Sequence, residues 1–292
     1  MSGSALSLKG VSKSFLDNHV LKSIDFEIPE GTIMGLVGKN GAGKTTMIKC
    51  LLGILRPDSG DAEIFGDPSW DLSVDTKQRI GYVPQVMTGF RWMRVGTLLD
   101  YTGAFYAKWN EKKVISLVRE WELDPHAKIS TLSEGERQKL SIIQAMGHEP
   151  DLYIFDEPVA SLDPVARRRF IKHLIDLNID EGRTMLFSTH ITSDLERVAA
   201  DVALLKDGNI SFKGDLSTLK DQVKRLHIRA ESNLPDPLPI DKIINSKIDG
   251  SSAIVTVNGL EESDIKSIRE KLSADVSVEQ LNLEDIFLEL NK

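Results

Sequence analysis

The chain has 292 residues, enough for two domains of roughly 150 residues and for a core that needs no disulfide. Its hydrophobic content of 41% and charged content of 27% exclude a disordered chain. The net charge of −8 argues against a nucleic-acid partner, and a single cysteine fits a reducing compartment. The sequence has no uncharged apolar run of about 18 residues and no basic start followed by a long apolar segment. We therefore expect neither a membrane-spanning helix nor a signal peptide.

The first 30 residues differ from those that follow, because apolar and polar residues alternate over 6–11 and 24–28. That alternation predicts a half-exposed antiparallel sheet. Further along, short apolar runs bounded by turn residues predict strands of a parallel sheet that is covered by helices on both faces. These runs are residues 33–37, 152–155, 185–187 and 202–205, and a buried helix is expected over 46–55.

Residues from about 87 to 150 have helical spacing and few strand signals, which predicts a helical subdomain inserted into the sheet domain. Its expected helices are 95–109, 111–121 and 134–146. The composition changes near residue 225, where three prolines in 232–239 predict a loop. The elements expected after that loop are a strand over 253–257, a helix over 261–272 and a strand over 276–278. The expected domains are therefore 1–224 and a small α/β domain, 225–292.

A glycine-rich segment between the first buried strand and its helix matches the pattern G-x-x-x-x-G-K-[ST]. Glycines let consecutive backbone N–H groups turn around a phosphate, and the following helix points its positive end at the same group. Lys44 would place a point charge on the β and γ oxygens, and Thr45 would offer a hydroxyl to Mg²⁺. The expected phosphate contacts are Gly38, Asn40, Gly41, Ala42, Gly43, Lys44, Thr45 and Thr46.

Two adjacent acids, Asp156 and Glu157, end the apolar run at 152–155. Neighbouring residues of a strand point to opposite sides, so the two carboxylates are expected to do different work. Asp156 would hold Mg²⁺, and Glu157 would orient and polarise an attacking water as general base. Alone, the pair would equally fit a strand end that enters solvent.

Taken in order over residues 5–220, these motifs resemble the ATP-binding subunits of ABC transporters. The resemblance implies that Phe15 stacks on adenine, that Gln85 senses the γ-phosphate and reaches Mg²⁺, and that His190 holds the γ-phosphate side. It makes Glu157, His190 and Lys44 the catalytic residues. It also implies a nucleotide contact from Asp163 in Ser161-Leu162-Asp163. Four simpler interpretations stay open, namely a core residue for Phe15, an ordinary loop residue for Gln85, a structural histidine for His190 and a helix cap for Asp163.

Leu132-Ser133-Glu134-Gly135-Glu136 resembles the family's signature motif, but acids replace its first glycine and its glutamine. The resemblance implies that Ser133 and Gly135 cover an ATP held by a second subunit, a copy or a paralogue. Ser133 is expected to begin the helix at 134–146, whose N-terminus favours an anion. Two other functions stay open, a soluble regulatory ATPase and a binding module that hydrolyses ATP poorly.

The implied fold is α/β, a P-loop NTPase parallel-sheet core with an N-terminal antiparallel β subdomain, an inserted helical subdomain and a C-terminal α/β appendage. The implied cofactors are ATP and Mg²⁺. The implied partner, besides the second ATP-binding subunit, is a separate integral membrane subunit contacted near Phe90, Trp92 and Met93. The protein would then lie in the cytoplasm, peripheral on the inner face of the cell membrane. Residues 105–121, 189–196 and 281–287 look like bacterial exporter-type cassettes, with peptide and antibiotic exporters nearest in appearance.

Overall fold

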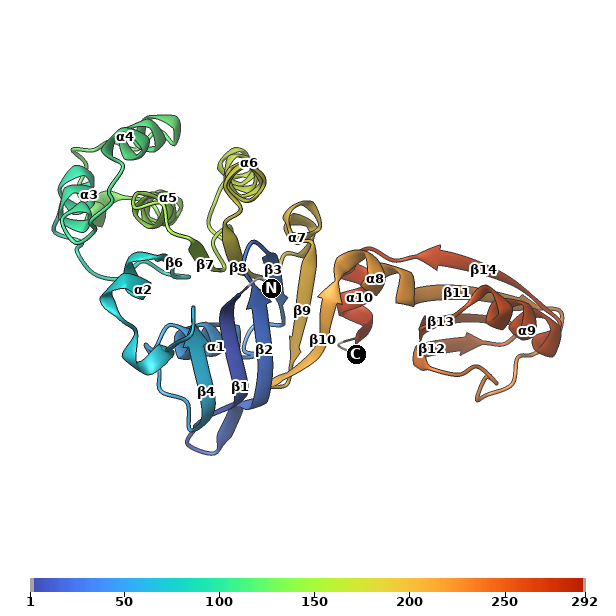
Figure 1. Cartoon of the computed structure of the whole chain (residues 1–292). Coiled ribbons are helices and arrows are strands. Elements are labelled where there is room, and N and C mark those ends of the chain that lie inside the picture. Colours follow the sequence, from blue (N-terminus) through green and yellow to red (C-terminus); the bar gives the residue numbers. More distant parts are fainter. Residues whose placement is uncertain (1–2, 291–292) are drawn as a thin grey trace. The chain divides into compact units, whose positions relative to one another are not determined.

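The computed structural model describes residues 3–290, with the side chain of Glu262 outside that description. The chain forms two compact units (Figure 1). The first contains the chain up to His190 together with Arg197–Lys213, and the second contains Ile191–Glu196 and the chain from Gly214 onward. The domain boundary expected at residue 224 stays a prediction.

The first unit begins with an antiparallel sheet of strand order β2-β1-β4-β5. Its strands are β1 (Ser4–Phe15), β2 (Asn18–Pro29), β4 (Ser59–Ile64) and β5 (Asp67–Pro68). Buried and more exposed residues alternate along β2, as the sequence pattern predicts for a sheet with one face in the core. The antiparallel sheet expected at the N-terminus is therefore confirmed.

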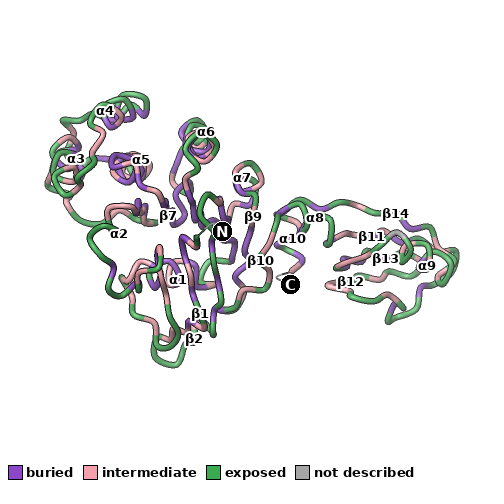
Figure 2. The backbone as a smooth tube through the Cα atoms, in the orientation of Figure 1, coloured by how far each residue is buried: buried purple, intermediate pink, exposed green. Residues whose placement is uncertain are grey.

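A second sheet, of order β10-β9-β3-β8-β7-β6, forms the centre of the first unit. Its strands are β3 (Ile33–Val37), β6 (Ile80–Val83), β7 (Leu152–Asp156), β8 (Thr184–Thr189), β9 (Asp201–Lys206) and β10 (Asn209–Asp215). The pairs β3·β8, β3·β9, β6·β7 and β7·β8 are parallel. Every residue of β3, β7 and β8 is buried (Figure 2), which explains why these strands read as continuous apolar runs.

Helix α1 (Lys44–Leu51) shares one hydrophobic core with both sheets. Met47, Ile48 and Leu51 pack there with residues of β1 and β3. The prediction of a helix over 46–55 is wrong at both ends. Gly53 explains the early stop, because it turns the chain at a φ of 65° and an added Cβ would lie 1.8 Å from the Ser69 carbonyl oxygen.

Helices fill the chain between β6 and β7, as expected for the inserted segment (Figure 1). They are α3 (Val95–Gly103), α4 (Glu111–Glu120) and α5 (Glu134–Met146), with a short 3-10 helix at Ile129–Thr131. Two further short helices, Ser69–Asp71 and α2 (Val74–Gln78), lie outside this segment, before β6. The helix predicted over 95–109 ends at Gly103. The chain folds back there, so that the Trp109 ring packs against Gly103 and Gly147, where a Cβ would come within 2.8 and 2.4 Å of it.

Helix α6 (Pro164–Glu181) packs on the parallel sheet through aromatic rings. The Phe170 ring meets Phe155 of β7 edge-on at 5.2 Å and lies 6.2 Å from Phe187 of β8. Such pairs add about 0.5–1.5 kcal/mol to the burial of their area. The short helix α7 (Thr192–Val198) follows β8.

The second unit contains an antiparallel sheet of order β12-β13-β11-β14. Its elements are α8 (Leu216–Gln222), β11 (Val223–Ala230), β12 (Ile243–Asp249), β13 (Ser252–Asn258), α9 (Glu262–Leu272), β14 (Ala274–Gln280) and α10 (Leu283–Leu290). The predicted loop, both predicted strands and the predicted helix are present, with longer strands than expected. Ile268 of α9 packs with Val276 and Leu226 in a core of this unit's own.

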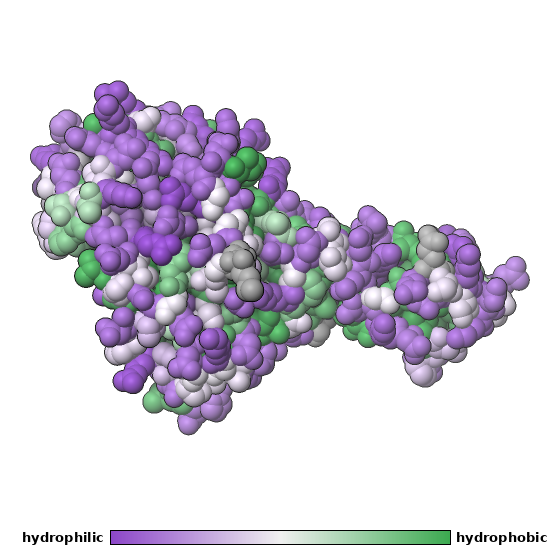
Figure 3. Space-filling model, in the orientation of Figure 1, coloured by the Kyte–Doolittle hydropathy of each residue, from purple (hydrophilic) through white to green (hydrophobic). Residues whose placement is uncertain are grey.

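Hydrophilic side chains cover most of the face shown in Figure 3, with hydrophobic ones scattered among them. Within residues 3–290, the structure contains no helix whose length and hydrophobicity would let it cross a bilayer.

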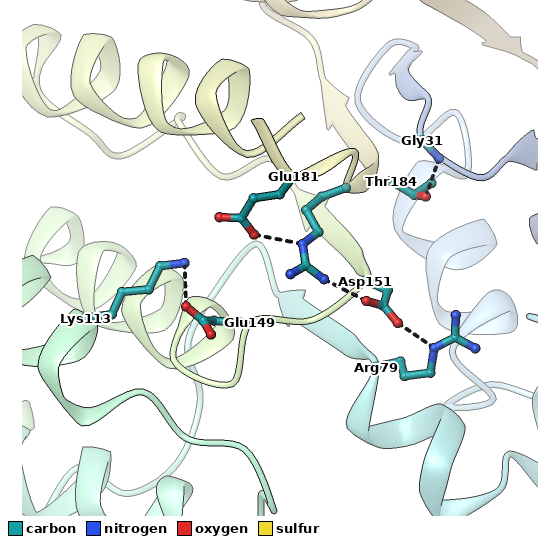
Figure 4. A network of polar contacts seen from close by, with 8 residues as sticks. Gly31, Arg79, Lys113, Glu149, Asp151, Glu181 and Thr184 are labelled. Carbon is teal, nitrogen blue, oxygen red and sulfur yellow. Dashed lines mark hydrogen bonds and ion pairs between the residues drawn. The ribbon is translucent and has the colours of Figure 1, made fainter. Parts of the chain in front are cut away.

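A network of charged side chains joins the segments that lead into β6, β7 and β8 (Figure 4). The Asp151 carboxylate accepts a hydrogen bond from Arg79 Nε and another from Arg183 Nη1, each at 2.7 Å. Arg183 Nε also donates to Glu181 at 2.9 Å. These contacts lie where the parallel strands start, so the opposite, carboxyl edge of the sheet is left for the loops that carry polar residues.

Candidate functional site

The loop from Gly38 to Thr45 joins the carboxyl end of β3 to α1. Gly41 and Gly43 have φ values of 84° and 107°, a backbone region that other residues enter only with strain. At Gly43 an added Cβ would also lie 3.0 Å from the Val20 carbonyl oxygen. The loop therefore needs glycine at position 43 for two independent reasons, as the sequence pattern predicts.

Lys44, the first residue of α1, is buried with 6% of its surface exposed. Its Nζ donates to the Gly38 carbonyl oxygen at 2.7 Å and forms an ion pair with Glu157 Oε1 at 3.1 Å. The loop thus folds around its own lysine, and the ammonium group is held toward the carboxyl edge of the sheet. The ion pair with Glu157 joins two residues that are 113 positions apart, and nothing in their spacing predicts it.

Glu157 follows β7 and has a φ of 51°, which turns the chain as it leaves the strand. Its carboxylate is 4% exposed and lies between two nitrogen groups. Oε1 pairs with Lys44, while Oε2 lies 2.7 Å from Nδ1 of His190, the residue that follows β8. Because β3, β8 and β7 are neighbours in the sheet, the three side chains meet at one edge.

Asp156 is completely buried, and its oxygens have different surroundings. Oδ1 accepts a hydrogen bond from the Ser188 hydroxyl at 2.8 Å. Oδ2 is buried and has no hydrogen-bond partner among the described residues. Burial raises the pKa of the Asp156 carboxyl above its ordinary value, although the nearby Thr45 and Ser188 side chains oppose that rise.

An orphaned carboxylate oxygen beside a threonine hydroxyl is a donor set that suits Mg²⁺, which takes oxygen ligands. Ser188 was missed in the sequence. It supports both acids, because its hydroxyl also accepts the Glu157 backbone N–H at 3.1 Å. Its place at the end of a buried strand, two residues before His190, was the available signal.

A cavity of about 350 Å³ opens over the glycine-rich loop. It brings Phe15 from the end of β1 and Gln85 from beyond β6 to the same space as the loop and Glu157. Phe15 is 47% exposed, so it is not a core residue. The expected site residues that line this cavity are Phe15, Asn40, Gly41, Gly43, Lys44, Thr45, Thr46, Gln85 and Glu157, and Val20 joins them. Gly38 and Ala42 lie in the same loop without lining it.

The signature segment is not among the residues that line the cavity. Ser133 caps the N-terminus of α5, as expected, and its hydroxyl accepts the Glu136 N–H at 3.2 Å. Gly135 lies so near Ser161 that a Cβ would be 2.7 Å from the Ser161 carbonyl oxygen. Within one chain the structure therefore brings Gly135 and its neighbour Glu134 to Ser161.

Asp163 caps α6, which begins at Pro164. Its Oδ1 accepts the N–H groups of Val165 and Ala166, each at 2.9 Å, and its Oδ2 lies 3.7 Å from Lys139 Nζ. These bonds hold the pKa of the Asp163 carboxyl below its usual range. The capping interpretation describes the contacts that are present, and a nucleotide contact stays a prediction.

Two of the three residues expected to contact a membrane subunit, Phe90 and Trp92, belong to an aromatic array. Phe90 lies 5.9 Å from Trp92 and 5.8 Å from Tyr101, and Tyr101 lies 5.0 Å from Phe105. Trp92 is 72% exposed, and Phe105 is also exposed. Met93 is half-buried.

Comparisons with known proteins agree on one family. The sequence model described as "ABC transporter" matches residues 21–160. The Bacillus subtilis (strain 168) ABC transporter ATP-binding protein YxlF is 34% identical over 223 residues, which are 74% of this chain and 73% of that protein. The Nod factor export ATP-binding protein I of Burkholderia lata (strain ATCC 17760) is 29% identical over 300 aligned positions, covering 98% of this chain and 96% of the relative.

Among solved structures, an ATP-binding subunit of an ABC transporter superimposes with a TM-score of 0.68 at 28% identity. The match covers 74% of this chain and 92% of that chain. The α/β fold class expected from the sequence is therefore confirmed.

Proposed function

This chain belongs to the ATP-binding proteins of ABC transporters, an ATP-hydrolysing family. From that premise we propose how its residues bind and hydrolyse ATP. The observation that carries the proposal is the convergence of Lys44, Glu157 and His190 at the carboxyl edge of the parallel sheet, beside a cavity lined by the glycine-rich loop. In an α/β sheet this edge is where ligands bind.

ATP binds in this cavity with its phosphates on the loop. The backbone N–H groups of the loop and the N-terminus of α1 stabilise the negative charge of the phosphates. The Lys44 ammonium group leaves its ion pair with Glu157 and contacts the β and γ oxygens instead. Phe15, exposed at the cavity wall, supplies a ring for the adenine to stack on. Gly38, Asn40 and Ala42 complete the loop, and Thr46 of α1 lines the cavity beside it.

Glu157 is the general base of hydrolysis. Once Lys44 has turned to the phosphates, the carboxylate is free to accept a proton from the attacking water. His190, which already contacts Oε2 at 2.7 Å, fixes the carboxylate and holds the γ-phosphate side. Charged groups that are already in position before the reaction begins provide most of the rate enhancement.

Thr45, Asp156 and Gln85 fit a bound Mg²⁺, since Asp156 offers a buried oxygen without a partner and the other two line the cavity. When bound, the ion neutralises charge on the phosphates. Ser188 restrains the Asp156 carboxylate by its hydrogen bond to Oδ1.

A second subunit, a copy or a paralogue, completes the site with Ser133, Gly135 and the loop at Asp163. The exposure of Ser133 at the start of α5, away from the chain's own cavity, supports action on a neighbouring subunit.

The transport partner is a separate integral membrane subunit that docks near Phe90, Trp92 and Met93. An exposed aromatic array of this kind is typical of interface anchors. The protein would thus act from the cytoplasm, peripheral on the inner face of the membrane. Its alignment along nearly its whole length with a relative named for Nod factor export supports export.

The test compares two variants in the full chain. Glu157→Gln should leave the affinity for ATP unchanged and lower the rate of phosphate release at least about 100-fold, the usual size of a general-base contribution. Lys44→Ala should weaken ATP binding itself. Binding is measured with a fluorescent ATP analogue and turnover by steady-state phosphate release. Normal turnover in the first variant would refute the role of Glu157, and unchanged affinity in the second would refute the loop assignment.

A further inference from the structure

The two acids that distinguish the signature segment make different contacts. Both the backbone N–H and the hydroxyl of Ser133 donate to one oxygen, Oε2 of Glu136, each at 2.7 Å. The Glu136 N–H donates back to the Ser133 hydroxyl at 3.2 Å. The pair forms a capping box that closes the first turn of α5.

This pair uses every donor of Ser133. A serine hydroxyl has one proton and a backbone amide has one, so neither can reach a second acceptor while Glu136 holds both. The backbone and side-chain bonds from Ser133 also keep the pKa of the Glu136 carboxyl below its usual range, so the group is an anion at neutral pH. A negative charge therefore already lies at the N-terminus of α5, where a phosphate would bind.

We propose that Glu136 is an internal competitor of the γ-phosphate, occupying the donors of Ser133 until the nucleotide of a second subunit displaces it. The inference rests on the proposed function, in which Ser133 and Gly135 cover a neighbouring ATP. Closure of two subunits then requires that a charge-assisted hydrogen bond break and that two anions approach, so Glu136 raises the ATP concentration at which the subunits close.

Glu134, the other acid, does not share this role. Its Oε1 accepts a hydrogen bond from the Ser161 hydroxyl at 3.1 Å, on the side of the segment where Gly135 lies against the Ser161 carbonyl. The backbone is thus fixed on that side, and rotation of the Glu136 side chain is enough to release Ser133.

The experiment measures ATP-dependent dimerisation by light scattering in the full chain carrying Glu157→Gln, which prevents turnover. Adding Glu136→Gln removes the charge and leaves a carbonyl acceptor for the capping box. We expect half-maximal dimerisation at an ATP·Mg²⁺ concentration about tenfold lower, since a tenfold change equals about 1.4 kcal/mol, the scale of one charge-assisted bond. Glu136→Ala, which frees both donors outright, should lower it as well.

Two matched variants serve as controls. Glu134→Gln removes a charge two residues away without freeing Ser133. Asp264→Asn alters the equivalent capping box of α9, where the Asp264 carboxylate accepts the Glu261 N–H at 3.0 Å. Neither should shift the midpoint more than about twofold.

An unchanged midpoint in both Glu136 variants would overturn the proposal while leaving the proposed function intact. So would an equal shift in Glu134→Gln, since the effect would then come from charge alone. If the parent and all variants bind ATP but none dimerises, the covering of ATP by a second copy fails as well.

Discussion

At the scale of single residues, two adjacent carboxylates show how surroundings separate two roles. Glu157 contacts His190 and forms an ion pair with Lys44, so its charge is matched by the ammonium group. Asp156 is completely buried and keeps one oxygen without a hydrogen-bond partner among the described residues. Burial raises its pKa, which means that the folded chain resists ionising this group. We therefore expect the buried Asp156 carboxylate to lower the stability of the folded chain.

Asp156→Asn removes a buried negative charge and should stabilise the ligand-free chain at pH 7 by about 1 kcal/mol, while abolishing Mg²⁺-dependent ATP hydrolysis. A carboxyl whose folded pKa is raised destabilises the fold above its unfolded pKa of 3.8, increasingly until the folded pKa is passed. The gain over the parent should thus shrink as the pH falls toward 4. Urea unfolding at several pH values measures it.

A variant that is less stable than the parent at pH 7 would contradict this account of Asp156. The matching control is Asp151→Asn at the opposite edge of the sheet, where the carboxylate is about half exposed and bonded to Arg79 and Arg183. That change should destabilise the chain by up to about 1 kcal/mol and leave turnover unaltered.

At the scale of elements, the glycine-rich loop depends on both backbone conformation and space. Gly43 has a φ of 107° and lies against Val20 and Leu21, whereas Gly66, in a turn between β4 and β5, has a φ of 83° with open space around it. A side chain at position 66 would cost backbone strain alone, whereas one at position 43 would cost strain and steric crowding together.

Gly66→Ala should cost about 1 kcal/mol through strain alone. Gly43→Ala should cost more, because the β2 backbone must shift, and it should also weaken ATP binding at least about tenfold by moving the loop amides. Thermal unfolding and nucleotide titration measure the two effects. Equal losses of stability without loss of ATP affinity would show that the loop tolerates a side chain at position 43.

At the scale of the whole molecule, the two units have separate cores, and the glycine-rich loop belongs to the first. We expect two calorimetric transitions. ATP at about 100-fold above its Kd should stabilise the first unit by about 2.7 kcal/mol, a rise of roughly 5–10 °C, and leave the second transition where it is.

The second transition can be identified with Arg225→Met. Arg225 donates to Glu289 of α10 at 3.0 Å and pairs with Glu279 of β14. The change should therefore reduce the free energy of unfolding of the second unit by roughly 1–2 kcal/mol, and so lower the temperature of the second transition. A single transition that moves as a whole with ATP would show instead that the units unfold together.

Local features determined what could be predicted from the sequence. The glycine-rich loop depends on glycines at positive φ and on a lysine and threonine at the start of a helix, all within eight residues. The buried strands read as apolar runs because both faces are covered. The end of α3 could not be predicted, since Trp109 folds back onto Gly103 and onto the distant Gly147.

Tertiary structure alone decided which charged groups meet. Lys44, Glu157 and His190 follow three different strands, and they converge because β3, β8 and β7 are neighbours in a parallel sheet, an order that the chain sequence does not express. The same holds for the buried oxygen of Asp156 and its support from Ser188. The sequence by itself thus determined which residue types are present and the local conformations they need. Their charge state and partners come from strand order and burial, which only the folded chain sets.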